Sequence, residues 1–207
     1  MPANAAPPVA EPISASVVED PNREAREFLT AYGVDKKTQR ALFEKLEAGL
    51  PWDSFTSNSV PVSTADYVED GFQVTESRYA DGSVSVSRMQ IPVKAAATGD
   101  FSVMSSPNSC TIGSNGARTN CIVDMWVGAV SMSFRANYNV VTSVVSSVWG
   151  ASYSIGAACS ASVSYLGRPT SNIGLLTVTA QMCVIGYASA FNLQVTLSKG
   201  IATESWW

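Results

Sequence analysis

The chain has 207 residues, with 13 Lys and Arg, 17 Asp and Glu, and no histidine. Only 14% of its residues are charged, against roughly 25% in an average soluble domain, and 29 serines account for much of the difference. The net charge of −4 argues against nucleic-acid binding, and the lack of histidine excludes a Ser-His-Asp triad and any imidazole metal ligand.

Charge is unevenly distributed along the chain, which suggests a boundary near residue 95. Residues 1–100 hold 15 acidic and nine basic side chains, whereas residues 101–207 hold two acidic and four basic ones. We therefore predict a disordered leader over 1–18, a helical pair with a β-hairpin over 19–95, and an antiparallel β-module over 96–207. The scarcity of charge in the last part implies that hydroxyls, amides or a partner cover its surface.

The first 18 residues are rich in Pro, Ala and Ser and lack the basic and apolar regions of a signal peptide. Ala3-Asn4-Ala5 has the small-x-small form that signal peptidase cleaves. We therefore expect that a natural signal peptide has been trimmed away and replaced by an initiator Met. No run of 18 apolar residues occurs, so no transmembrane helix is predicted.

Two short helices are predicted next. Asp20-Pro21 is typical of a helix start, and Gly33 of a helix end; Asp35 and Gly49 bound the second helix in the same way. The apolar positions recur at helical spacing: Ala25, Phe28, Leu29, Tyr32, Leu42, Phe43 and Leu46. We expect this stripe to pack on the strands of the same chain rather than on a second copy.

A β-hairpin is predicted where residues 72–79 and 83–91 flank Asp81-Gly82, because a D-G pair between alternating segments is a strong turn signal. Four nearby carboxylates raise the alternative of a calcium site: Asp66, Glu69, Asp70 and Asp81. Their spacing fits no EF-hand pattern, so a solvated acidic loop is the favoured interpretation.

From residue 122 onward apolar and polar residues alternate, which is typical of strands with one buried face. Residues 126–140 form either one long strand or two strands joined at a bend, with Trp126 among the buried positions. Later strands repeat the pattern: Val145 to Ile155, Ala161 to Tyr165, Leu176 to Val184, and Phe191 to Leu197. The predicted fold is mainly β with an N-terminal α-hairpin, ending in an antiparallel β-sandwich or barrel-like module.

Four cysteines lie in this module, and none belongs to a C-x-x-C pair: Cys110, Cys121, Cys159 and Cys183. Because intervals of 10, 37 and 23 residues do not suit a zinc site, we predict two disulfides and an oxidising, extracellular setting. Three connectivities exist. We favour Cys110–Cys121, which closes a polar loop, with Cys159–Cys183; four buried free thiols in a cytosolic protein are the alternative.

Four segments resemble a set of secreted actinobacterial proteins of unassigned function. They are LEAGLPWDS (46–54), YADGSVSV (79–86), SVWGA (147–151) and ESW (204–206). The resemblance covers most of the chain and implies secretion. It brings no activity and no site residues, because the segments correspond to a loop, a turn and a strand.

The residues that suggest chemistry are few. No Gly-x-Ser-x-Gly or Ser-x-x-Lys motif stands out, and adjacent Ser198 and Lys199 would point to opposite faces of a strand. Asp124 and Glu204, the only acids of residues 101–207, form the one candidate glycosidase pair, which we do not favour. We predict a non-enzymatic protein with no catalytic residue, metal or cofactor.

Tryptophans are the candidate contact residues: Trp126, Trp149, Trp206 and Trp207. The last two either cover the end of their own sheet or stack on sugars, a membrane interface or another subunit. Three functions stay open. The first is a secreted structural protein that self-associates, the second a module that binds polysaccharide or a cell surface, and the third a membrane-active protein whose amphipathic hairpin is residues 126–140. An inhibitor that presents the loop 110–121 is a further alternative.

Overall fold

The computed structural model describes residues 22–56, 58–94, 110–156, 158–182 and 188–207. Two helices, α1 (Arg23–Ala31) and α2 (Lys36–Glu47), and the single turn η1 (Asp53–Phe55) come before the first strand. The strands, with one further turn η2 (Ser114–Gly116), are β1 (Ser63–Glu69), β2 (Phe72–Arg78), β3 (Val84–Gln90), β4 (Val93–Lys94), β5 (Thr111–Ile112), β6 (Ala117–Val127), β7 (Val130–Asn139), β8 (Val144–Ile155), β9 (Ala158–Thr170), β10 (Ile173–Met182), β11 (Ala188–Ser198) and β12 (Ile201–Trp206).

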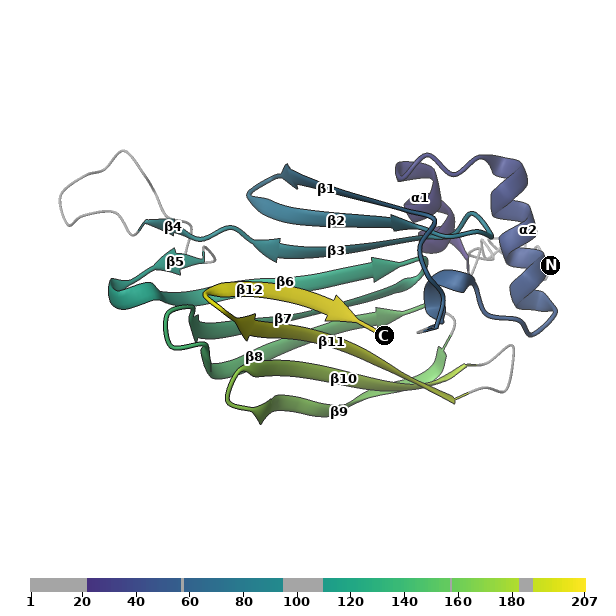
Figure 1. Cartoon of the computed structure of the whole chain (residues 1–207). Helices are drawn as coiled ribbons and strands as arrows, with labels where there is room; N and C mark the ends of the chain where they lie inside the picture. The colour runs from purple at the N-terminus through teal and green to yellow at the C-terminus, as the bar shows by residue number, and fades with distance from the viewer. Residues whose placement is uncertain (1–21, 57, 95–109, 157, 183–187) are drawn as a thin grey trace, which may run out of the picture.

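These strands form two sheets. Sheet A has the order β1-β2-β3-β6-β7-β8, and the short strands β5 and β4 extend it beside the first residues of β6. Sheet B has the order β9-β10-β11-β12, and it lies across β6, β7 and β8, with the helices at one end of the molecule (Figure 1). The predicted mainly-β, sandwich-like fold with an N-terminal α-hairpin is confirmed.

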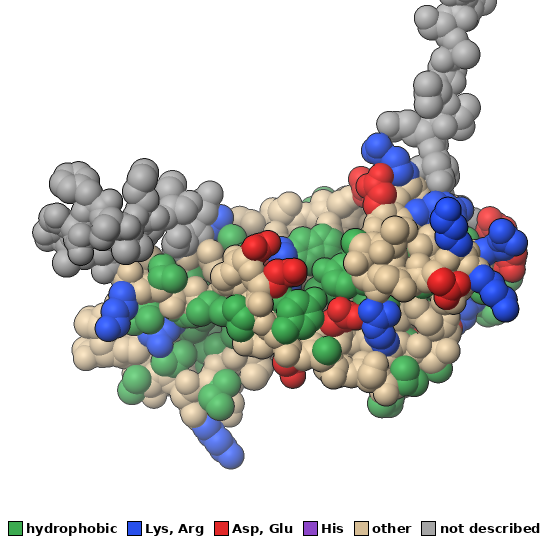
Figure 2. Space-filling model, turned by 90° about the horizontal axis from the view of Figure 1, so that it is seen from above, with side chains coloured by type: hydrophobic (Ala, Val, Ile, Leu, Met, Phe, Trp, Pro, Cys, Tyr) green, Lys and Arg blue, Asp and Glu red, His purple; other side chains and the backbone are tan. Residues whose placement is uncertain are grey.

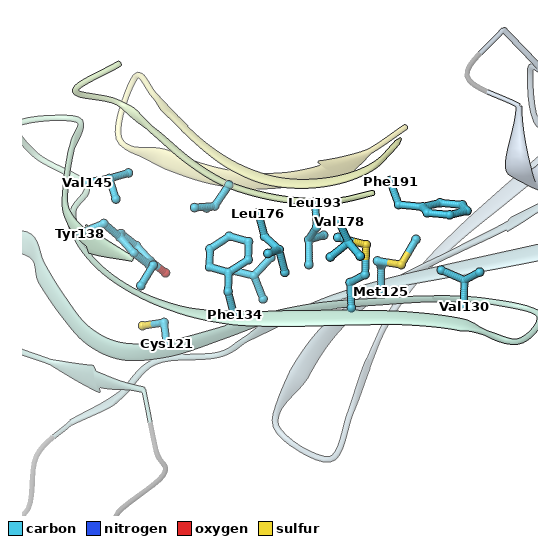
Figure 3. Close-up of a cluster of buried hydrophobic side chains, with 14 of the residues drawn as sticks. Cys121, Met125, Val130, Phe134, Tyr138, Val145, Leu176, Val178, Phe191 and Leu193 are labelled. Atoms are coloured by element: carbon cyan, nitrogen blue, oxygen red, sulfur yellow. The ribbon is translucent and has the colours of Figure 1, made fainter. Parts of the chain in front are cut away.

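The larger core lies between the two sheets (Figure 3). We call the two facing surfaces the inner faces and the opposite surfaces the outer faces. Alternate residues of each strand point inward, as the period of two predicts. Sheet A contributes Val123, Met125, Val127, Val130, Met132, Phe134, Ala136, Tyr138 and Val145, and sheet B contributes Leu176, Val178, Ala180, Phe191, Leu193, Val195 and Leu197.

Residues 126–140 are two strands, not one. β6 ends at Val127 and β7 begins at Val130, and these two residues pair across a tight turn that contains Gly128 with φ of 56°. The turn shifts the alternation by one residue, so Val127 is buried and Trp126 points to the outer face. The prediction that Trp126 belongs to the buried face was therefore wrong.

The two predicted helices are present, and the second begins at the predicted cap, Asp35. Asp35 caps α2 by accepting hydrogen bonds from the backbone N–H groups of Lys37 and Thr38 (2.9 and 3.0 Å), and Gly33 has a φ of 71°. Asn22 is the N-cap position of α1; the predicted start at Asp20-Pro21 lies outside the described residues. The helices pack on the outer face of β2 and β3, in a second cluster of Ala25, Leu29, Val34, Leu42, Phe43, Trp52, Val74, Val84 and Val86.

Strand β1 was missed by the sequence analysis, which interpreted its acids as a solvated loop. Asp70-Gly71 is a second D-G turn, with φ of 48° and 80°, and it joins β1 to β2 as Asp81-Gly82 helps to join β2 to β3. Asp66 therefore lies in a strand and not in a solvated loop, and it accepts a hydrogen bond from Thr75 on the neighbouring strand (2.7 Å).

The boundary predicted near residue 95 falls within one sheet. β3 pairs with β6, with Ser85 opposite Val127 and Arg88 opposite Asp124. The fall in charge along the chain therefore marks a change of surface and not a separate folding unit, because backbone hydrogen bonds cross it. The predicted leader, residues 1–18, lies outside the described residues.

The predicted disulfide Cys110–Cys121 is confirmed, and it joins the segment before β5 to β6. The predicted Cys159–Cys183 bridge involves Cys183, which is outside the described part of the chain. Neither α1 nor α2 has the length and apolar content needed to span a bilayer.

Candidate functional site

The four tryptophans do not form a single site. Trp126 and Trp149 both lie on the outer face of sheet A, opposite Ser131 and Arg135 of β7 respectively. Trp206 pairs with inward-pointing Leu193 and packs against the larger core. Trp207 follows on the outer face of sheet B and is 42% exposed. The sequence analysis expected Trp206 and Trp207 either to cover their own sheet or to be exposed for contacts. Trp206 covers the core, and Trp207 is exposed.

An aromatic row crosses the outer face of sheet B. Thr177 of β10 lies opposite Tyr165 of β9 and opposite Asn192 of β11, and Asn192 and Trp207 exchange two backbone hydrogen bonds (2.9 and 3.1 Å). The four side chains therefore share one face. Tyr165 and Trp207 are three strand spacings apart, or roughly 14 Å. We call Tyr165, Thr177, Asn192 and Trp207 the aromatic row.

The ring of Tyr165 lies along the sheet and not away from it. Gly167, the next residue on the same face of β9, leaves the space for it: a Cβ atom at position 167 would lie 3.1 Å from the Tyr165 Oη and 3.2 Å from Cζ. Tyr165 is 40% exposed although its ring follows the surface. One face of this ring is thus available for stacking with a ligand.

Hydrogen bonds fix the polar side chains between the two rings. The Thr177 hydroxyl donates to Asn192 Oδ1 (2.8 Å), and Asn192 Nδ2 donates to the Trp207 carbonyl (3.4 Å). An amide side chain offers two N–H donors and two acceptor lone pairs. After these bonds, Asn192 keeps one donor and one acceptor side by side, which suits a ligand that carries adjacent hydroxyl groups.

No charged side chain lies in the aromatic row. Three charged residues belong to β9–β12 and their turns, and none lies in the aromatic row: Arg168, Lys199 and Glu204. Glu204 pairs with inward-pointing Val195 and accepts a hydrogen bond from Ser87 of β3 (3.2 Å). The outer-face neighbours of the aromatic row on β10 and β11 are Thr179, Gln194, Leu175 and Ala190, all uncharged, so the row is suited to an uncharged ligand.

A second polar cluster lies on the outer face of sheet A. The Arg88 guanidinium makes two hydrogen bonds to Asp124, both 3.0 Å, and sits between the rings of Phe72 and Trp126, at 4.6 and 4.1 Å from their centroids. The Asp124 side chain is only 6% exposed. Burial raises the pKa of Asp124, against the opposing effect of the Arg88 hydrogen bonds and charge. All the strong interactions of this cluster are internal, which indicates a structural role.

The candidate catalytic pair is not assembled. Asp124 lies on the outer face of sheet A, bound to Arg88, whereas Glu204 bonds to Ser87 on the inner side of β3. A glycosidase needs its two carboxyl groups to face one substrate, and these two lie on opposite faces of sheet A. The sequence analysis had not favoured this pair. The four acids considered for calcium are also dispersed, and the described residues contain no group of three or more metal-ligating side chains.

Two of the segments that carry the resemblance meet at Asp81. Its carboxylate accepts hydrogen bonds from Lys45 Nζ (2.9 Å), the Asp53 backbone N–H (2.8 Å), and both the backbone N–H and the hydroxyl of Ser83 (3.0 and 2.6 Å). Through these hydrogen bonds Asp81 connects α2 and the loop after it to the β2–β3 turn. Burial raises the pKa of Asp81, but the hydrogen bonds outweigh it and the net shift is downward.

We expect Asp81→Asn to lower the free energy of unfolding by about 2 kcal/mol at neutral pH, since buried donors lose a charged acceptor. A lowered pKa in the folded state stabilises the protein above the ordinary aspartate pKa, and this contribution is lost as the pH falls below about 4. Urea unfolding between neutral and acidic pH measures both effects. The control Asp66→Asn removes the charge from one exposed hydrogen-bond acceptor and should change little; equal losses in the two variants would contradict the role of Asp81.

No family model, curated protein or solved structure matches this chain. The contacts and exposure of the aromatic row therefore carry the functional argument. Sequence analysis identified Trp207 but missed Tyr165, Thr177 and Asn192 as a group. The alternation placed Tyr165 on the buried face with Ala161 and Val163, which was wrong, because a register shift between Thr177 and Val178 moves Tyr165 to the outer face. Only the strand register reveals that the four residues adjoin.

Proposed function

We propose that the protein is a secreted, non-enzymatic module that binds an uncharged polysaccharide along the outer face of sheet B. The observation that carries the proposal is the aromatic row, with exposed rings of Tyr165 and Trp207 on either side of Thr177 and Asn192. Sugar rings present C–H groups on their faces, which pack on the electron-rich face of an aromatic ring, and hydroxyls at their edges, which bond to amides.

The absence of charged side chains in the aromatic row supports an uncharged ligand. The length of the row supports an extended one, because two stacking rings roughly 14 Å apart must be bridged by several sugar units. The Cys110–Cys121 disulfide is compatible with an oxidising, extracellular location, where such polysaccharides occur.

Self-association was the function favoured from the sequence, with polysaccharide binding as its alternative, and the free edge of sheet A bears on it. Among the strands that the structure describes, β1 pairs only with β2, and exposed Val60, Val62 and Val68 lie in or next to it. The same strand carries Asp66 and Glu69, and like charges on a free edge oppose its pairing with a second copy. We therefore favour binding of a separate ligand over assembly of the chain with itself.

The test is retention on insoluble neutral polysaccharides, with Kd values measured by depletion. Tyr165→Ala and Trp207→Ala are each expected to weaken binding about tenfold, equivalent to about 1.4 kcal/mol. Gly167→Val should also weaken it, because the added side chain lifts the Tyr165 ring from the sheet.

Tyr153→Ala is the matched control, since Tyr153 is exposed to a similar degree, 37%, but belongs to sheet A. Retention that survives loss of both rings of the aromatic row, or failure of the intact protein to bind any neutral polysaccharide, would overturn the proposal.

A further inference from the structure

The end of the sandwich opposite the helices is built from four connected loops. The Val140 N–H donates to the Gly116 carbonyl (3.1 Å), Val145 N–H to Ser171 (2.8 Å), and Leu197 N–H to Asn172 (2.9 Å). These bonds link the segments around residues 116, 141, 171 and 199 into one surface. We call this surface, with the adjoining strand β4, the loop end.

The loop end is basic. It carries Lys94, Arg118, Arg168 and Lys199, and none of them forms an ion pair with another described residue. No Asp or Glu occurs in the described residues of β4, β5, the first half of β6, or the loops after β7, β9 and β11. Seen from above, this end shows blue side chains and no red ones (Figure 2).

The opposite end has charges of both signs. A groove of about 530 Å³ between α1 and α2 is lined by Arg26, Lys36 and Arg40 but also by Glu44 and Glu47. The acids of the helices thus offset their bases. Among the described residues, basic side chains without acidic neighbours in the same loops gather at the loop end, where they would attract a negatively charged surface.

Apolar side chains project from the same loop end. Val141 is 73% exposed and Ile201 is 62% exposed, and Val93 beside Lys94 is 42% exposed. Val141 is held in place, because Asn139 Oδ1 accepts hydrogen bonds from the backbone N–H groups of Val141 and Thr142 (2.9 and 3.0 Å) and the Val141 side chain lies against Gly116. These apolar residues are thus fixed in an exposed position next to the cations.

We propose that the loop end docks on an anionic lipid bilayer. Lysine and arginine are attracted to anionic headgroups, and small apolar side chains at loop tips enter the interface between headgroups and acyl chains. A soluble polyanion would satisfy the cations but would leave exposed Val141 and Ile201 without a role. This surface is distinct from the aromatic row, so the two proposals are independent.

The test is co-sedimentation of the full chain with vesicles of phosphatidylcholine, with and without phosphatidylserine. Binding is expected only with phosphatidylserine and should fall as salt is added. Arg168→Gln with Lys199→Gln should weaken binding about 25-fold, roughly fivefold for each charge. Val141→Ser with Ile201→Ser, which preserves every charge, should also weaken it.

Lys36→Gln with Lys37→Gln is the matched control, because it removes two exposed cations from the helical end. Equal losses in the two charge variants, or equal binding to neutral vesicles, would overturn the proposal. Binding to soluble dextran sulfate with the same charge dependence, and lipid binding insensitive to the Val141 and Ile201 substitutions, would overturn it in favour of a polyanion.

Discussion

Arg88→Met is expected to lower the free energy of unfolding by about 4 kcal/mol at neutral pH. The substitution leaves the Asp124 carboxylate, with a side chain only 6% exposed, without its bidentate partner, and breaking one half of a buried ion pair is far costlier than removing both. Chemical denaturation monitored by tryptophan fluorescence would measure the loss.

The pH dependence and a double variant separate charge from packing. Burial already raises the pKa of Asp124, and without Arg88 it should rise further. A raised pKa means that the folded state holds its proton longer than the unfolded chain. The deficit of Arg88→Met should therefore shrink as the pH is lowered toward about 4. Arg88→Met with Asp124→Leu should regain most of the stability. A deficit independent of pH, and unrelieved in the double variant, would mean that lost packing against Phe72 and Trp126 dominates.

A second large effect is expected from Gly128→Ala, which should cost about 4 kcal/mol. Gly128 has a φ of 56°, which disfavours any side chain, and its Cβ would collide with the ring of Trp52. That ring cannot withdraw, because Trp52 is fully buried, stacks on Phe55 at 5.1 Å, and donates from Nε1 to the Leu42 carbonyl at 2.6 Å.

Gly71→Ala is the matched control for Gly128→Ala. Gly71 has a φ of 80° in the β1–β2 turn, and a Cβ there would meet no atom within 4 Å. Its cost should be backbone strain alone, about 1 kcal/mol. Thermal unfolding of both variants isolates the steric contribution of Trp52. Equal shifts in Tm would show that the indole does not restrict this turn.

The Trp52 and Asp81 contacts give a structural role to two of the segments on which the expected resemblance was based. Trp52 and Asp53 belong to LEAGLPWDS, and Asp81 belongs to YADGSVSV. Trp52 fills the space between the helices and the β6–β7 turn, and Asp81 receives Lys45 and the Asp53 N–H. Both segments attach the helical pair to sheet A. The surfaces proposed for binding lie elsewhere, on sheet B and at the loop end.

Local signals in the sequence were sufficient for the elements they govern. The Asp35 cap, Gly33, the turn at Asp81-Gly82 and the short loop between Cys110 and Cys121 were all predicted and are all present. Each depends on residues close together in the chain, so no knowledge of tertiary structure was needed. The alternation in β10 and β11 likewise identified their buried residues, because a strand has a period of two wherever it is placed.

What the sequence by itself determined is thus the class of fold, the scarcity of charge in the second half, and one disulfide. The tertiary structure decided which faces meet. The turn at Gly128 shifted the alternation and moved Trp126 to the outer face, and β3 joined β6 across the expected boundary. The aromatic row depends on the register of four strands, with an irregularity between Thr177 and Val178 that the alternation does not reveal. A shift of one residue in any of these strands would carry its side chains to the opposite face, and register is set by contacts between distant segments.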